Sequence, residues 1–237
     1  MAFEHFLAMT SAEYGAAARL PRRLAWMACH FSPDHSGLCD LPEQLPQDSI
    51  LILNDRLPIA GHDRQRILEQ LSEVVRKFRC RGLLLDFQRG GVLALADLAD
   101  ILFHALPCPV CVTPEYAPEG CPVFLPPIPV QQKIEDCLVP WKGREIWLES
   151  ALNGCEIRLT PRGAEYDTLT EAAALPFFEE KLLCHYGIEI GEGFVRFSLL
   201  RTPEDLGLLL KKAEELGVTA AVGLYQELVN SPQLYQV

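Results

Sequence analysis

The sequence predicts an α/β fold, namely a compact (β/α)₈ barrel of the TIM type in which some helices are missing. Short, nearly continuous apolar runs alternate with segments of helical periodicity, which is typical of a parallel sheet covered on both faces. Eight such runs occur in 237 residues, close to the ~250 residues of a usual TIM barrel. An open, doubly wound sheet is the alternative.

The expected strands are rich in β-branched and other apolar side chains. They cover residues 24–31, 49–55, 82–88, 109–115, 122–127, 145–150, 194–200 and 219–228. The segment between the fourth and fifth of them is too short for a helix. A further run at 155–160 follows Asn153-Gly154, a strong two-residue turn signal, so we expect it to pair back on 145–150 as a hairpin.

Three helices have clear sequence signals. Residues 63–78 carry one apolar stripe opposite a charged face, and residues 92–106 are apolar all round. Residues 203–216 are preceded by Thr202 as a cap, with Asp205 completing a capping box and Gly217 just past the end. Weaker helices are expected at 12–19, 131–138 and 176–185. Without a linker, low-complexity tract or repeat, we predict one domain over 1–237.

The overall charge limits the classes of partner. The formal net charge is −11 and the pI is about 5.0, which argues against nucleic acid or an anionic membrane as the main partner. No apolar run approaches the ~20 residues of a membrane-spanning helix. The amino-terminal segment shows no basic region before an apolar core, so we expect no secretion signal and a cytoplasmic location.

The chain contains nine cysteines. An odd number, scattered over a long chain, indicates reduced and mostly buried thiols. Cys108 and Cys111 have the spacing of a redox or metal pair, but prolines surround them and no second such pair exists. Cys29, His30, His35 and Cys39 match no standard zinc spacing. We therefore expect no metal and no cofactor, with a zinc or redox role as the less favoured alternative.

Polar side chains recur at the carboxyl ends of the expected strands, where parallel barrels hold their active sites. The candidate catalytic residues are Asp86, Glu149 and Glu227. The candidate substrate-binding residues are Asn54, Asp55, Gln88, Arg89, Glu115, Tyr116 and Tyr225. The competing explanation for any one position is a solvent-exposed strand end or a cap of the following helix.

Strand alternation predicts where some of these side chains point. Leu84, Asp86 and Gln88 share one face of their strand, because successive residues alternate between faces. In the last strand Ala221, Gly223, Tyr225 and Glu227 share a face. Small residues suit a crowded barrel interior, so we expect Tyr225 and Glu227 to point into the mouth.

Residues 81–88, RGLLLDFQ, resemble the signature strand of chitinase-like family 18 glycoside hydrolases, Asp-Gly-x-Asp-x-Asp-x-Glu. Gly82, Asp86 and Phe87 match that pattern, whereas Arg81 and Leu84 replace the first two aspartates. Gln88 occupies the position of the catalytic acid. The strand is the third of the expected set, whereas the family has it fourth. Residues 202–228 are similar to the family's final helix and strand, where Tyr225 matches an aromatic floor for the sugar.

The resemblance implies a glycoside-hydrolase-like barrel. In that family the glutamate protonates the leaving oxygen, the substrate's N-acetyl group attacks, and the aspartate two residues earlier orients that group. Because an amide has no proton to give, Gln88 cannot be the general acid. The expected ligand is a carbohydrate or other small polar molecule, bound by a pseudoenzyme that has lost its acid.

Three alternatives stay open. Weak hydrolysis could proceed through Glu115, Glu149 or Glu227, if two of them lie ~5–9 Å apart. Arg89 with Gly90 and Gly91 could instead bind the phosphate of a small-molecule substrate. The barrel could also be a non-catalytic scaffold. The oligomeric state is left open.

Overall fold

The computed structural model describes residues 3–17, 21–170 and 175–235. Contacts divide the chain into two compact units. The barrel unit comprises Met1–Leu125, Gly143–Leu148 and Thr219–Val237, and the inserted unit comprises Pro126–Lys142 and Glu149–Val218. The division does not test whether the units fold separately, so the single domain over 1–237 stays a prediction.

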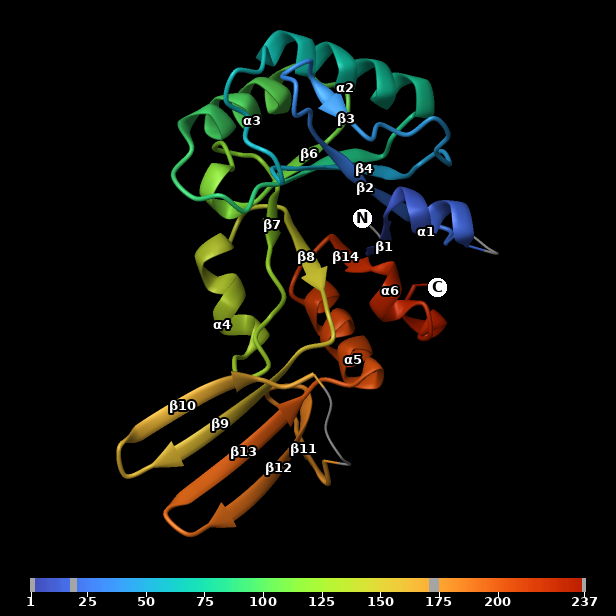
Figure 1. Cartoon of the computed structure of the whole chain (residues 1–237). Helices are drawn as coiled ribbons and strands as arrows, with labels where there is room; N and C mark the ends of the chain where they lie inside the picture. The colour runs from blue at the N-terminus through green and yellow to red at the C-terminus, as the bar shows by residue number, and fades with distance from the viewer. Residues whose placement is uncertain (1–2, 18–20, 171–174, 236–237) are drawn as a thin grey trace. The chain divides into compact units, whose positions relative to one another are not determined.

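Eight parallel strands close into a barrel (Figure 1). In chain order they are β1 (Glu4–Met9), β2 (Leu24–Phe31), β4 (Ile50–Asn54), β5 (Gly82–Asp86), β6 (Val110–Val112), β7 (Val123–Leu125), β8 (Ile146–Ser150) and β14 (Ala220–Leu224). The first strand pairs with both β14 and β2, which closes the ring. The predicted (β/α)₈ fold class is thereby confirmed.

Seven of the eight expected strands are barrel strands, and one position was assigned wrongly. Residues 194–200 do not enter the barrel, and β1 takes the missing place. β1 was not predicted because it is a six-residue run that starts with the polar residues Glu4 and His5. A short strand β3 (Leu38–Cys39) pairs antiparallel with β2.

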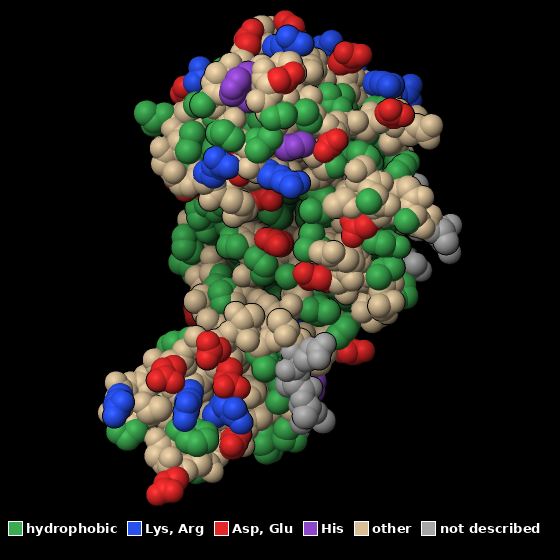
Figure 2. Space-filling model, viewed as in Figure 1, with side chains coloured by type: hydrophobic (Ala, Val, Ile, Leu, Met, Phe, Trp, Pro, Cys, Tyr) green, Lys and Arg blue, Asp and Glu red, His purple; other side chains and the backbone are tan. Residues whose placement is uncertain are grey.

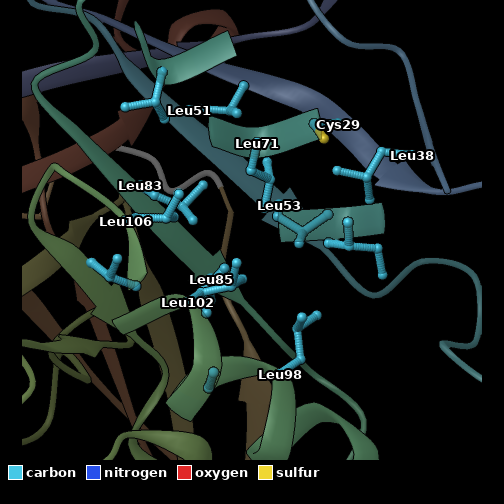
Figure 3. Close-up of a cluster of buried hydrophobic side chains, with 14 of the residues drawn as sticks. Cys29, Leu38, Leu51, Leu53, Leu71, Leu83, Leu85, Leu98, Leu102 and Leu106 are labelled. Carbon is cyan, nitrogen blue, oxygen red and sulfur yellow. The ribbon is translucent and has the colours of Figure 1, made fainter. Parts of the chain in front are cut away.

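Two apolar clusters hold the barrel unit together. The inner cluster fills the barrel with side chains from every strand, including Phe6, Ile52, Leu84, Trp147 and Val222. The outer cluster lies between the strands and helices α2 (Arg64–Phe78) and α3 (Leu93–Ala105). Figure 3 shows part of the outer cluster, with leucines of β4 and β5 against leucines of the two helices. Strands buried on both faces therefore explain the continuous apolar runs.

The strong helix predictions agree with the structure to within one residue at each end. They correspond to α2, α3 and α5 (Pro203–Glu215), the last with the expected Thr202–Asp205 capping box. The remaining helices are α1 (Ser11–Ala16), α4 (Ile134–Leu138), α6 (Tyr225–Leu228) and the 3₁₀ turns η1 (Pro114–Tyr116), η2 (Val139–Trp141) and η3 (Pro232–Leu234). Positions 18 and 19 of the expected 12–19 helix lie outside the described residues. Among the helices described, none is long and apolar enough to span a membrane.

The inserted unit contains a five-stranded antiparallel sheet that the sequence analysis did not expect. Its order is β10 (Gly163–Thr168), β9 (Gly154–Thr160), β13 (Phe194–Leu200), β12 (Cys184–Gly191) and β11 (Phe177–Glu179). The predicted helix at 176–185 is wrong, because those residues form β11 and the start of β12. The sheet explains why the run at 194–200 looks like a strand without belonging to the barrel.

The predicted hairpin between 145–150 and 155–160 is also wrong. Both edges of β8 are already used, by β7 and β14. The run at 155–160 instead forms β9, which pairs with β10 across a tight turn and with β13 on its other side. The turn ends at Gly163, whose φ of 135° is accessible to glycine at little cost.

Candidate functional site at the mouth of the barrel

The strand quoted for its family resemblance has the predicted geometry. Leu84 belongs to the inner cluster, whereas Leu83, Leu85 and Phe87 belong to the outer one. Asp86 therefore ends β5 on its inward face, as alternation predicted. Because β1 precedes it, β5 is the fourth barrel strand in chain order and not the third. The strand thus has the position that the resemblance implies.

Asp86 and Gln88 contact each other directly. The Gln88 side-chain amide donates a hydrogen bond to Asp86 Oδ1. Burial raises the pKa of Asp86, the charge of Asp55 adds to the rise, and the hydrogen bond from Gln88 opposes it. Gln88 itself is exposed, so its amide remains accessible at the end of the strand.

A polar row crosses three neighbouring strands at this end of the barrel. Strand register places His30 of β2 beside Asn54 of β4, and Asn54 beside Asp86 of β5. Cys29 and Phe31 belong to the outer cluster, so His30 faces the opposite way, toward the interior. In the sequence His30 stands out only as a possible zinc ligand, because an irregularity in β2 between Trp26 and Cys29 hides the alternation that would show its inward direction.

Asn54 and Arg89 are held by backbone groups. The Asn54 amide donates to the Met27 carbonyl oxygen at 3.2 Å, and its Oδ1 accepts from the Arg56 N–H at 3.1 Å. The Arg89 guanidinium donates to the Arg56 carbonyl oxygen at 2.8 Å. These contacts join the loop that follows β4 to the loop that follows β5.

Asp55 is a buried carboxylate that holds the loop after β5 in place. Its side chain is 3% exposed, and its two carboxylate oxygens accept the backbone N–H groups of Gln88 and Arg89, each at 2.9 Å. A carboxylate whose two oxygens both accept backbone N–H groups stabilises the conformation of the loop more than it contributes to ligand contact. Asp55 thus fixes the backbone from which the Gln88 side chain projects.

Glu115 and Tyr116, in η1, hold the same loop from the neighbouring strand. Glu115 Oε1 accepts the Gly91 N–H, and the Tyr116 hydroxyl accepts the Val92 N–H at 3.1 Å while donating to the Arg89 carbonyl. Tyr116 is buried, so its ring is not exposed to a ligand.

Tyr225 and Glu227 do not lie where alternation predicted. The inward residues of β14 are Ala220, Val222 and Leu224, and the strand ends before Tyr225, which starts α6. Tyr225 packs against the outer cluster, so the expected aromatic floor beneath Asp86 and Gln88 is wrong. The prediction failed because bulky Val222 and Leu224, and not the small residues between them, fill the interior.

The remaining carboxylates differ in their surroundings. Glu149 lies near the carboxyl end of β8, half-buried, and the contacts place it in the inserted unit. One oxygen of Glu227, Oε2, is buried and makes no hydrogen bond within the described part of the chain. Neither observation assigns a catalytic role to Glu149 or Glu227, so both roles stay predictions.

The cysteines are free thiols. Six of the nine are buried and three are partly exposed. Burial raises the pKa of the Cys80 thiol to about 12 and those of Cys108, Cys121 and Cys184 to about 11, so these groups are neutral at physiological pH. Within the residues that the structure covers, no three metal-ligating side chains form a group that could hold an ion.

No family model matches the sequence, and no curated protein sequence matches it. Solved structures do match. A double mutant of a GH18 chitinase from Cycas revoluta, in complex with (GlcNAc)4, superposes with a TM-score of 0.62 at 11% identity over 98% of both chains. The chitinase-like agglutinin of Robinia pseudoacacia gives 0.59 at 12% identity, over 92% of this chain and 93% of that one.

The spore cortex-lytic enzyme SleL of Bacillus cereus gives a TM-score of 0.52 at 11% identity, over 94% of this chain and 70% of that one. At such low identities these similarities concern the fold. They confirm, for the fold, the resemblance that residues 81–88 indicated. The chain therefore has a glycoside-hydrolase-like barrel with the fold of the family 18 chitinases.

Proposed function

We propose that the mouth of the barrel binds a carbohydrate that contains N-acetylglucosamine and does not hydrolyse it through position 88. The observation that carries this proposal is Gln88. It follows the fourth barrel strand, donates its amide to Asp86, and occupies the position where the family resemblance implies a catalytic acid. An amide cannot protonate a leaving oxygen, whereas it can hydrogen-bond a sugar hydroxyl or an acetamide.

The surroundings of Gln88 favour binding because they are held rigidly. Asp55, Glu115 and Tyr116 accept four backbone N–H groups of residues 88–92 between them. A loop fixed in advance loses little conformational entropy when a ligand binds. The row of His30, Asn54 and Asp86 adds donors and acceptors along the inward face. Two solved structures of the same fold agree with a carbohydrate ligand. One is a mutant chitinase in complex with (GlcNAc)4, and the other is a chitinase-like agglutinin.

A phosphorylated substrate is less favoured by the same contacts. The Gly91 N–H, which a phosphate would need, is occupied by the Glu115 carboxylate. The Arg89 guanidinium donates to a carbonyl oxygen, and Asp55 lies beneath the loop. Two carboxylates beside the loop would repel an anion.

A non-catalytic scaffold is the second candidate. The observation in its favour is that the aromatic side chains expected to stack on a sugar are not exposed at the mouth. Tyr116 is 6% exposed, and Tyr225 is half-buried against the outer cluster. A scaffold needs no ligand at this end of the barrel.

Calorimetric titration with (GlcNAc)4 tests the proposal. We expect binding by the wild-type protein, a loss of affinity of at least ~10-fold in Asp86→Ala and Gln88→Ala, and no release of shorter oligomers. Glu73→Ala is the control, since Glu73 is an exposed carboxylate on α2. Absence of binding would favour the scaffold. Hydrolysis of (GlcNAc)4 that survives Gln88→Ala would contradict the proposal that the protein is not catalytic, and Glu149 and Glu227 would then be the residues to test.

A further inference from the structure

The two faces of the five-stranded sheet in the inserted unit have opposite chemical character. Strand register aligns Tyr166, Ile157, Phe197 and Ile188 in one row across the sheet. Two rows on the same face flank it, one containing Leu159 and Ile190 and the other containing Leu199 and Phe177. These three rows contain no charged side chain, and we call them the apolar sheet face.

Most of this face is open to solvent. Its strongly exposed large side chains are Leu159 (42%), Tyr166 (64%), Phe177 (50%), Ile188 (49%) and Ile190 (80%). Among the described residues of the unit, cover is found at one end of this face, where Val130 packs on Cys155, Cys184 and Leu199. Single exposed apolar residues are normal on proteins, whereas five on one sheet face indicate an interaction surface.

The opposite face of the sheet is suited to water. A row of Glu165, Arg158, Arg196 and Glu189 crosses it from β10 to β12. Arg196 forms ion pairs with Glu189 and with Glu156. Figure 2 shows acidic and basic side chains gathered over this sheet. The sheet is therefore amphipathic, and its apolar side needs a partner.

The chemistry of the apolar sheet face restricts what that partner can be. Without lysine or arginine in the three rows, the face offers nothing to a nucleic acid or an anionic lipid surface. The rows between β9 and β12 are mainly aliphatic, with few groups to hydrogen-bond sugar hydroxyls. An uncharged protein surface of similar shape remains, and an identical sheet face meets that requirement in an isologous pair.

The exposed area is also of the right size. If a fully exposed large side chain presents ~200 Å², the five exposed residues present roughly 550 Å². A standard interface buries about 800 Å² on each partner. Partly exposed neighbours such as Ile157, Val195 and Phe197 can supply the difference, so two such faces suffice for a stable dimer.

Pairing through the sheet edge is less favourable than pairing through the face. The edge strand β10 is exposed along its whole length. It carries Glu165 and Asp167, which two copies of β10 would bring close together in an antiparallel pair. Like charges at this distance are destabilising, and acidic residues on edge strands commonly prevent such pairing.

We propose that two copies of this chain pack through their apolar sheet faces, as the two layers of a β-sandwich. The assembly places the residues of β9, β12 and β13 at the centre of the interface. The charged face of each sheet then remains in water.

Sedimentation velocity of the full chain tests this at about 50 µM, above the micromolar Kd that is the weak limit for interfaces of standard size. We expect twice the 26.5 kDa mass of one chain. Ile190→Lys should weaken association at least ~100-fold, because it buries an unpaired charge. Leu93→Lys is the matched control, since Leu93 is 82% exposed and lies on α3 of the barrel unit.

Three outcomes would overturn the proposal. One is a monomeric wild type at this concentration, whether or not it binds uncharged lipid vesicles. A second is a dimer that Ile190→Lys leaves intact. The third is equal dissociation by Ile190→Lys and Leu93→Lys, which would place the interface elsewhere. Circular dichroism of both variants checks that the charge did not unfold the sheet.

Discussion

The barrel and the inserted sheet are both built from strands rich in apolar residues, but barrel strands are buried on both faces and strands of the inserted sheet are not. Barrel strands such as β4 and β5 are apolar on both faces and lie between two clusters. The strands of the inserted sheet alternate, as in β12, where Tyr186, Ile188 and Ile190 are separated by Gly187 and Glu189. A polar residue at every second position therefore indicates a sheet with one solvent face, even where the run looks apolar overall.

The strongest test of this difference compares one leucine with one isoleucine. Leu53→Ala, at a barrel position with no exposure, should lower the free energy of unfolding by about 2–5 kcal/mol. Ile188→Ala, at a position 49% exposed, should cost about 1 kcal/mol or less. Urea unfolding at low protein concentration, followed by circular dichroism, measures both. Equal losses would contradict the contrast between the two regions.

The inserted unit contains a buried arginine that donates hydrogen bonds to several backbone carbonyl groups. Arg201 is 1% exposed and donates to the carbonyl oxygens of Ile128, Leu182 and Leu183 and to Asn153 Oδ1. Arg201→Met removes one donor from each of the four acceptors, of which the Ile128 carbonyl keeps a hydrogen bond from the Asn153 amide at 2.9 Å. We therefore expect the free energy of unfolding to fall by about 2–3 kcal/mol.

Amide hydrogen exchange locates this loss of stability. We expect protection from exchange to fall most in β9 and β13 and little in β4 and β5. Arg201→Lys should recover only part of the stability, because an ammonium group lacks the planar fork of donors. Full recovery by lysine would mean that charge alone, and not the set of four acceptors, matters here.

A smaller effect is expected from the loop at the barrel mouth. Asp55→Ala removes the acceptor of two backbone N–H groups and should cost about 1–2 kcal/mol. It should also weaken (GlcNAc)4 binding without changing the secondary structure. Glu73→Ala again serves as the control. Unchanged affinity would show that the loop keeps its shape without Asp55.

The smallest effect concerns the one inward carboxylate of β5. Burial raises the folded-state pKa of Asp86, so folding favours its protonated form. The resulting penalty builds up as the pH rises from the unfolded-state pKa to the raised folded-state pKa and is complete above it. Asp86→Asn should therefore increase stability by a few tenths of a kcal/mol at neutral pH. The gain should vanish once the pH falls below the unfolded-state pKa of about 3.9. A gain that is largest in acid would contradict the direction of the shift.

Much of the barrel could be predicted because strands that are buried on both faces consist of continuous apolar runs, which are visible in the sequence. Seven strands and the ends of α2, α3 and α5 follow from apolar runs, periodicity and capping residues. The pair of Asp86 and Gln88 follows from alternation within one strand. These features are local, so a single sequence contains the information they need.

The rest depends on contacts between distant segments. Glu115 and Tyr116 have the chemistry of ligand-binding residues, yet their partners are backbone groups of another loop. Tyr225 was misplaced because which face of β14 turns inward depends on the volume that seven other strands leave free. His30 was missed because one irregularity in β2 shifts the alternation.

The buried, neutral thiols can serve as probes of local unfolding. A thiol that is buried and protonated reacts with an alkylating reagent only when the structure around it opens. Cys29, Cys80 and Cys111 report on the barrel unit, and Cys155 and Cys184 on the inserted unit. Timed labelling followed by peptide mass spectrometry gives a rate for each site. Equal rates in both sets would mean that the whole chain opens as one cooperative body, and two separate groups of rates would mean that the sheet can melt while the barrel stays closed.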